Sequence, residues 1–229
     1  MKKQIMIVAA HPDDEILGCG GTMSKKIKEG YRVDVVIMGQ GLTSRKNDHS
    51  KNKIKENIIK LKKNSMNANK FIGATSVKNL LLPDNAMDTV NFLKVVHLLE
   101  SEILINKPSI VFTHHLGDLN IDHKITHQAV ITACRPVPNF CVKKIYSFEV
   151  LSSTEWQSSS DNNPFVPTYF EDISDHLKDK INALKYYDSE MRKAPHARSY
   201  ENVENLAKFR GSSIGVAAAE AFITIRDIN

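Results

Sequence analysis

The stretch IMIVAAHPDDE, residues 5–15, decides the fold of this chain. Its first part, Ile5 to Ala10, is a continuous apolar run, which is typical of a strand buried on both faces of a parallel sheet. The run is too short for an export signal or a membrane span, because charge returns at Asp13. We therefore predict a buried first strand that ends in a polar loop.

Strand-like and helix-like stretches alternate along the first half of the chain. Apolar or β-branched runs predict further strands at 33–38, 77–82 and 109–113. Helical spacing and helix-ending residues predict helices at 16–29, 53–72, 88–106 and 124–134. Strict alternation of this kind is typical of a mostly parallel sheet with helices on both faces.

The C-terminal third has a different pattern. It predicts strands at 143–153 and 168–173, followed by a long amphipathic helix at 175–193. No internal repeat, linker or second-domain boundary is visible in the sequence. We predict a single domain over residues 1–229, with a Rossmann-like, mostly parallel α/β sheet and a small C-terminal α+β addition.

Composition and cysteine content indicate an ordinary soluble protein. Hydrophobic residues make up 41% and charged residues 25%, which excludes a disordered chain, a collagen-like repeat and a disulfide-stapled mini-protein. Cys19, Cys134 and Cys141 have no CxxC spacing, as expected for buried thiols in a reducing compartment. We predict a cytoplasmic protein without a transmembrane segment, and leave open whether it forms a homo-oligomer.

The net charge of +5 comes from one segment. Residues 45–70 hold nine basic and two acidic side chains, so the remainder is slightly acidic. Three interpretations stay open for this segment: a solvated helix face, an edge that binds a phosphate-bearing substrate, and non-specific nucleic-acid binding. The last is disfavoured because residues 32–70 contain no aromatic side chain that could stack on bases. We expect no nucleic-acid partner.

Two polar clusters each follow a predicted parallel strand. The first contains His11, Asp13 and Asp14, and the second is THHLGDLNIDH at 113–123. Carboxyl ends of parallel strands share one edge of a sheet, so the clusters are expected to meet. Two histidines and a carboxylate with an open position suit a hydrolytic zinc site, although iron, cobalt or manganese accept the same ligands. Polar surface turns are the alternative interpretation.

Several motifs resemble those of the PIG-L/LmbE-like deacetylases, which are metal-dependent hydrolases of N-acetyl sugars. AHPDDE at 10–15 and GCGGT at 18–22 resemble the family signature, and GDLNIDH at 117–123 resembles its second motif. LLPDNAMD at 81–88, HARS at 196–199 and the stretch from 209 to 222 are also similar, so the resemblance covers nearly the whole chain. It implies removal of an N-acetyl group from an N-acetylglucosamine-type sugar conjugate.

The resemblance also implies roles for individual residues. His11, Asp14 and His123 are expected to bind zinc, and Asp13 is expected to be the general base that takes a proton from metal-bound water. Many members have histidine where this chain has Asn120, which can donate a hydrogen bond but cannot be a cation. Asn120 and His115, with His114 as an alternative to the latter, are therefore the candidates for stabilising the oxyanion.

Further candidates concern the substrate and the supporting residues. Asp84 resembles the family's acceptor of sugar hydroxyls, although Pro83-Asp84-Asn85 is also ordinary turn chemistry. Arg45 and Arg198 are candidates for binding an anionic substrate group, with a solvated loop charge as the alternative for Arg45. We expect Asp122 to orient His123 or another imidazole.

Three points stay open in the sequence. His127 stands four residues after His123 and could share its helical face, but packing is the favoured interpretation. Gly18, Gly20 and Gly21 are expected to let the first helix begin close to the metal loop. The alternative functions are deacylation of another N-acyl amide and a catalytically silent carbohydrate-binding protein of the same fold.

Overall fold

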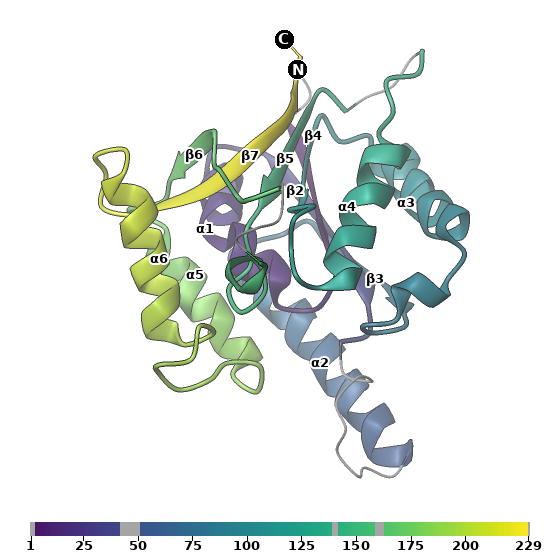
Figure 1. Ribbon diagram of the computed structural model, residues 1–229, viewed down its shortest axis with the longest axis horizontal. Coiled ribbons are helices and arrows are strands. Elements are labelled where there is room, and N and C mark those ends of the chain that lie inside the picture. Colours follow the sequence, from purple (N-terminus) through teal and green to yellow (C-terminus); the bar gives the residue numbers. More distant parts are fainter. Residues whose placement is uncertain (1–2, 42–50, 139–141, 159–162, 229) are drawn as a thin grey trace.

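One sheet of seven strands organises the chain in the computed structural model, which describes residues 3–41, 51–138, 142–158 and 163–228 (Figure 1). The strand order is β3-β2-β1-β4-β5-β7-β6. The strands are β1 (Gln4–Ala9), β2 (Arg32–Gly39), β3 (Ser76–Leu82), β4 (Ile110–His114), β5 (Lys144–Phe148), β6 (Tyr169–Asp172) and β7 (Ala219–Asp227). β1 to β5 pair in parallel, and β7 runs antiparallel to both β5 and β6. The mostly parallel α/β sheet is confirmed.

Helices cover both faces of this sheet. They are α1 (Asp14–Lys28), α2 (Lys51–Ile72), α3 (Phe92–Asn106), α4 (Ile121–Ala133), α5 (Leu177–Leu184) and α6 (Tyr200–Ser212), with short 3-10 turns η1 (Met87–Thr89), η2 (Thr154–Trp156) and η3 (Lys185–Tyr187). Side chains of β1 alternate between the faces: Ile5 and Ile7 pack with α1, α2 and α5, whereas Met6 and Val8 pack with α3 and α4. No helix in the described ranges has both the length and the apolar character needed to cross a bilayer.

The C-terminal third differs most from the sequence prediction. β5 ends at Phe148 rather than at 153, because the chain turns there into η2 and Ser152 adopts a φ of 66°. The helix predicted at 175–193 ends at Leu184 and continues only as η3. Leu184 and Tyr187 are both buried, and a spacing of three residues puts them on one face of either an α-helix or a 3-10 helix. The periodicity of apolar residues therefore could not reveal that α5 ends at Leu184. α6 and β7 were not predicted.

A buried ion pair fastens this C-terminal part to α1. Lys180 Nζ of α5 lies 2.6 Å from Glu220 Oε1 of β7, and it also donates to the carbonyl of Leu17, at 2.7 Å. Glu220 accepts hydrogen bonds from the backbone N–H groups of Gly21 and Thr22, at 3.0 and 2.7 Å. Since α1 begins at the first polar loop, these contacts help to fix that loop.

The glycines of α1 serve this close packing rather than the start of the helix. A Cβ atom at Gly21 would lie 2.7 Å from Ile173 Cδ1, and one at Gly18 would overlap the ring of Phe148. Both positions lie within α1, four or more residues after it begins at Asp14. The GCGGT motif therefore lets β5 and the C-terminal part approach the helix.

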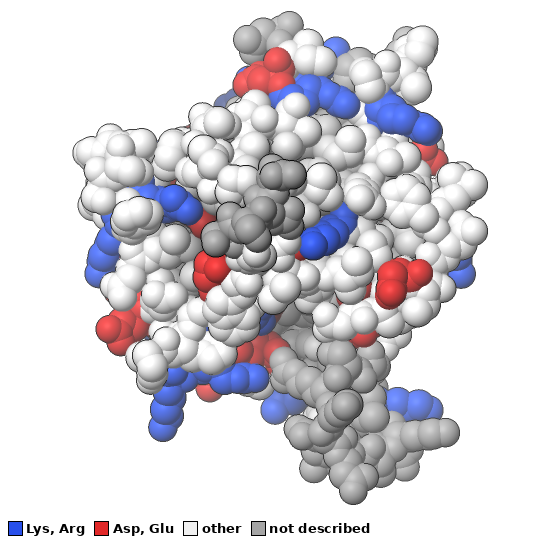
Figure 2. Space-filling model, viewed as in Figure 1, with Lys and Arg blue, Asp and Glu red and all other residues white. Residues whose placement is uncertain are grey.

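The basic segment is spread along an exposed helix. Lys55, Lys60, Lys62, Lys63 and Lys70 are exposed on α2, and Arg45 and Cys141 lie outside the described residues. On the face shown in Figure 2, Lys and Arg side chains are dispersed and interspersed with Asp and Glu. The interpretation of this segment as a solvated helix face, a substrate-binding edge or a nucleic-acid surface stays open.

Candidate active site

The loop after β1 places two acidic side chains in succession. Asp13 has a φ of 108°, which is unusual for a residue with a side chain and turns the chain sharply into α1. Its backbone N–H donates to Glu15 Oε2 at 3.0 Å, and its carbonyl accepts from Leu17 at 2.9 Å. Asp13 and Asp14 are thus held, almost fully buried, at the N-terminus of α1, whose dipole favours carboxylates.

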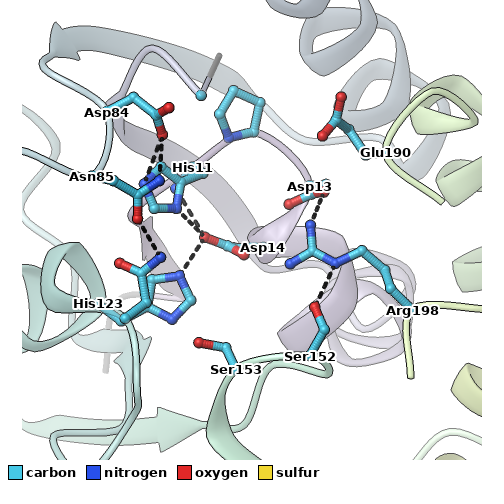
Figure 3. A pocket seen from close by; sticks show the side chains of 13 residues that line it. His11, Asp13, Asp14, Asp84, Asn85, His123, Ser152, Ser153, Glu190 and Arg198 are labelled. Carbon is cyan, nitrogen blue, oxygen red and sulfur yellow. Dashed lines mark hydrogen bonds and ion pairs between the residues drawn. The ribbon is translucent and has the colours of Figure 1, made fainter. Parts of the chain in front are cut away.

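The three predicted metal ligands converge on one point. Asp14 Oδ2 lies 3.3 Å from His11 Nδ1 and 3.2 Å from His123 Nε2. Figure 3 shows Asp14 lying between the two imidazoles, which come from the β1–α1 loop and from α4. Ligand atoms of a tetrahedral zinc site lie about 3.3 Å apart when the bonds are about 2.0 Å long. The donor set therefore fits a divalent metal such as zinc.

A carboxylate stands behind each imidazole. Asp122 Oδ2 is 2.9 Å from His11 Nε2, and Asp118 Oδ1 is 3.1 Å from His123 Nδ1. Carboxylates in this position orient metal-binding histidines and fix which nitrogen faces the metal. We predicted that Asp122 orients His123 or another imidazole, and in the structure it contacts the imidazole of His11. Asp118 was missed, although it stands within the GDLNIDH motif.

These contacts also control the charge of the two histidines. Burial lowers the pKa of His11, but the hydrogen bonds to Asp122 and Asp14 outweigh it and raise the pKa to about 10. For His123 the neighbouring Asp14 and Asp118 overcome burial in the same way and raise the pKa to about 9. The carboxylates around His11 and His123 thus favour positive charge at this point of the site.

A second group of possible ligands shares His11. Its Nε2 lies 3.3 Å from Asp84 Oδ1 as well as 2.9 Å from Asp122 Oδ2. Asp122, however, also accepts hydrogen bonds from the backbone N–H groups of Asn85 and Met87, at 2.6 and 3.0 Å. These bonds make Asp122 a support for His11 and for the 84–87 turn, and favour the group that contains Asp14 as the metal site.

The predicted base contacts a residue from the far end of the chain. Arg198 Nη1 lies 2.7 Å from Asp13 Oδ2, and Arg198 Nε donates to Ser152 Oγ at 3.1 Å. Burial raises the pKa of Asp13 well above its usual range, and the guanidinium opposes this shift. In the structure Arg198 lines the pocket and contacts Asp13 and Ser152, and its binding of an anionic substrate group stays a prediction.

The pocket around these residues is almost entirely polar. Asp84, Asn85, Asn120, Ser153 and Glu190 line it together with the His–Asp–His cluster. Asn120 caps α4 by accepting the N–H of Asp122 at 2.8 Å, and its Nδ2 donates to Asn85 Oδ1 at 2.9 Å. Glu190 lies on the same side as Asp13 in Figure 3 and was missed, because only the folded loop brings it here.

Of three further histidines in this region, His114 reaches the cluster, with its Nε2 3.6 Å from Asp14 Oδ2, whereas His115 and His127 point elsewhere. His115 Nε2 lies 3.0 Å from the carbonyl oxygen of Asn163, outside the pocket. His114 stacks on His123 with ring centroids 3.9 Å apart, and its Nε2 accepts the N–H of Ala10 at 2.7 Å. His127 Nδ1 lies 2.8 Å from the carbonyl oxygen of His114, which indicates a packing role.

Fold and site together define an α/β protein with a buried His–Asp–His centre beside a further carboxylate. The family model described as PIG-L, GlcNAc-PI de-N-acetylase, matches residues 6–134. An uncharacterized deacetylase, YaiS, from Escherichia coli strain K12 is 30% identical over 196 residues, which cover 82% of this chain and 92% of the relative. The chain belongs to the PIG-L family of deacetylases, as its motifs indicated.

Solved structures show the same fold at lower identity. The N,N'-diacetylchitobiose deacetylase of Pyrococcus horikoshii is 20% identical with a TM-score of 0.80, and the match covers 98% of this chain and 84% of that one. GalB, a 4-carboxy-2-hydroxymuconate hydratase from Pseudomonas putida KT2440, is 22% identical with a TM-score of 0.76, covering 100% and 98%. Proteins of this fold therefore catalyse more than one reaction, and the reaction of this chain must be argued from the residues of its site.

Proposed function

We propose that this chain, acting as one domain over residues 1–229, is a zinc-dependent hydrolase that removes the acetyl group from an N-acetylglucosamine-type sugar conjugate. The observation that carries the proposal is the convergence of His11, Asp14 and His123 on one point with Asp13 beside them. Other divalent transition metals fit the same nitrogen and oxygen ligands. The buried thiol of Cys19 supports a cytoplasmic location.

Asp13 is the residue that moves protons in this proposal. When bound, a divalent metal supplies Lewis-acid chemistry that makes water a nucleophile at neutral pH and polarises an amide carbonyl. Arg198 holds Asp13 Oδ2, and we assign proton transfer to Oδ1. Asp13 accepts the proton of the attacking water and then donates it to the departing amine nitrogen, so one carboxyl group serves as base and acid in turn.

Asn120 is the candidate donor to the developing oxyanion. Its Oδ1 is fixed by the N–H of Asp122, which defines the orientation of the amide and directs Nδ2 toward Asn85 in the pocket. An amide has a second N–H that a substrate oxygen can accept. His115 is the weaker candidate, because its ring lies against Asn163.

The polar wall suits the hydroxyl groups of a sugar. Asp84 and Asn85 come from the turn after β3 and offer a carboxylate and an amide to substrate hydroxyls. Asp13, Asp14, Asp84 and Glu190 make this pocket acidic, and Arg198 is already paired with Asp13. We therefore place any anionic group of the conjugate outside the pocket.

Acetate release from N-acetylglucosamine conjugates tests the proposal. The zinc-loaded protein is compared with Asp13→Asn, which keeps the shape of the side chain and leaves all three ligands in place. We expect the variant to bind zinc at the same stoichiometry and to release acetate about 10²–10⁴ times more slowly, the usual range for a general base. Equal rates would remove Asp13 from the mechanism.

A substrate panel separates the alternatives. Formyl, acetyl and longer acyl groups on the same sugar, together with non-sugar acetamides, show whether another N-acyl amide is preferred. Binding of the sugars without turnover of any of them by the zinc-loaded protein would favour the catalytically silent carbohydrate-binding protein.

A further inference from the structure

An exposed aromatic pair is carried by two segments that also line the pocket. Trp156, the one tryptophan of the chain, is 52% exposed, and its ring centroid lies 5.7 Å from that of exposed His196, at an interplanar angle of 73°. Trp156 follows pocket-lining Ser153 by three residues, and His196 precedes pocket-lining Arg198 by two. Three residues span at most about 11 Å, so the pair is within reach of a ligand that extends out of the pocket.

The turn that presents Trp156 is attached to the metal centre. Thr154 Oγ1 donates to Asp118 Oδ2 at 2.7 Å, and Ser153 Oγ also donates to Asp118, the carboxylate that contacts His123. Glu155 accepts the backbone N–H groups of the two serines before Thr154. The turn that carries Trp156 is therefore held in a defined position relative to His123, as preorganised recognition requires.

The segment that presents His196 is attached to the base. The backbone N–H of Arg198 donates to His196 Nδ1 at 3.0 Å, which orients the imidazole. The side chain of Arg198 bridges Asp13 and Ser152, so it joins this segment to the tryptophan turn. Both rings are thus connected through Arg198 and Asp118 to the residues proposed to act on the substrate.

The chemistry of the pair differs from that of the pocket. The pocket offers carboxylates, amides and hydroxyls, whereas the pair offers an apolar ring surface, and Glu155 and Gln157 flank Trp156 in the sequence. A pyranose ring has this same combination, with C–H groups on its faces and hydroxyls around its edge. Packing such a face against an indole removes apolar surface from water, and the edge hydroxyls can meet the polar flanks.

We infer that Trp156 and His196 form a second sugar subsite, which stacks against a pyranose ring linked to the sugar whose acetyl group is removed. The inference rests on the proposed function, since it names the part of the substrate beyond the N-acetyl sugar. It makes the preferred substrate at least a disaccharide, with the reacting sugar in the pocket and its neighbour on the aromatic pair.

Tryptophan fluorescence tests the subsite directly, because all tryptophan emission comes from Trp156. The zinc-loaded, full-length Asp13→Asn protein is titrated with N-acetylglucosamine, with N,N'-diacetylchitobiose and with octyl N-acetylglucosaminide. We expect a saturable change in emission with the disaccharide, at a concentration about fivefold to tenfold lower than any change with the monosaccharide. No change with the disaccharide, or a stronger response to the octyl glycoside, would overturn the inference.

Kinetics on the otherwise unaltered enzyme provide the second test. In Trp156→Ala, the ratio of kcat/KM for the disaccharide to that for the monosaccharide should fall about fivefold to tenfold. Phe209→Ala is the matched control, because it removes an aromatic ring of similar exposure, 62%, from α6. An unchanged ratio in Trp156→Ala, or an equal fall in the control, contradicts the subsite.

The two tests separate this inference from the proposed function. Fluorescence needs no turnover, so a disaccharide response in Asp13→Asn together with no acetate release by the unaltered, zinc-loaded protein would keep the subsite and refute the hydrolase. Acetate release with an unchanged ratio of disaccharide to monosaccharide kcat/KM in Trp156→Ala would keep the hydrolase and refute the subsite.

Discussion

The two parts of this chain contribute different things to one pocket. The first part, β1 to α4, supplies His11, Asp14 and His123 from the ends of its parallel strands and from α4. The C-terminal part, β5 to β7, supplies Arg198, which contacts Asp13, and the turn that contacts Asp118. The first part thus holds the groups proposed for chemistry, and the second holds those groups in place and extends the pocket.

The difference shows why a resemblance in motifs leaves the substrate open. The ligand motifs are short, consecutive and close to strand ends. The contacts of the C-terminal part join residues as far apart as Asp13 and Arg198, and they depend on loops between the elements. Changes to the proposed ligands in the first part should therefore remove metal and activity together, whereas changes in the second part should alter stability, pH dependence or selectivity while metal remains bound.

The largest effect is expected from the ligand His11. His11→Ala should lose stoichiometric zinc and more than about 10³-fold of the acetate-release rate, because the Lewis acid contributes several kcal/mol. Metal analysis of the purified protein, together with acetate release, measures both. His97→Ala, an exposed histidine of α3, is the control. Full stoichiometric zinc in His11→Ala would undermine the proposed site.

Removing one partner of the ion pair between α5 and β7 should destabilise the fold. Lys180→Met leaves the carboxylate of Glu220 buried without its cation, which costs about 3–5 kcal/mol. Urea unfolding measures this loss, and the variant that remains folded should still bind zinc. Exposed Lys185→Met should change the stability by less than about 0.5 kcal/mol. Similar stability of both variants would show that the pair does not fasten the two parts.

Arg198→Met should change the pH dependence of the reaction. Asp13 must be ionised to accept a proton, and the guanidinium favours the ionised form, so its removal raises the pKa of Asp13. The acid limb of the kcat/KM profile should therefore move to higher pH, and kcat should fall about tenfold to hundredfold because Asp13 is no longer held. Arg198→Lys should restore part of the shift. A higher KM with an unmoved limb would instead support the anion-binding role predicted from the sequence.

The smallest effect is expected from Glu171→Gln, which removes the carboxylate that joins β6 to α1. Burial alone would raise the pKa of Glu171, but hydrogen bonds from Lys25, Tyr169 and Lys26 outweigh it and lower the pKa below its ordinary value of 4.5. A lowered pKa in the folded state stabilises the protein above that ordinary value, and the contribution is lost as the pH falls through the folded pKa. Glu171→Gln should therefore cost about 1 kcal/mol at pH 7, since solvent screens the pair.

Urea unfolding at pH 7 and at decreasing pH checks this prediction. The difference between Glu171→Gln and the natural protein should shrink as the solution is acidified below pH 4.5. A difference that stays constant with pH would assign the loss to packing of the side chain and not to its charge.

The sheet could be predicted from the sequence because its strands are buried on both faces. Ile5 to Ala10 is a continuous apolar run, and Val33 to Met38 is apolar except for Asp34. Both lie in the strands that the structure shows, apart from the last residue of the first run. The same rule predicts that the two polar clusters meet, since each follows the end of a strand, whereas the choice of His11, Asp14 and His123 as ligands came from the family resemblance. The hydrophobic pattern of a short segment is therefore sufficient to predict a strand that is buried along its whole length.

The C-terminal part could not be predicted equally well, because its contacts are made by residues distant in sequence. β7 is buried only over its first four residues, so it lacks the continuous pattern of β1. α6 had a usable signal that we did not weigh: Ser199 caps it by accepting the N–H of Asn202 at 3.1 Å. The pairing of Arg198 with Asp13 had no local signal at all.

The most direct test of the account is a crystal structure of the zinc-loaded protein with anomalous diffraction data. We predict one strong anomalous peak bound by His11 Nδ1, Asp14 and His123 Nε2, with Asp13 beside it and still paired with Arg198. A peak between His11 Nε2, Asp84 and Asp122 instead, or no peak at either group, would contradict the proposed metal site and the mechanism built on it.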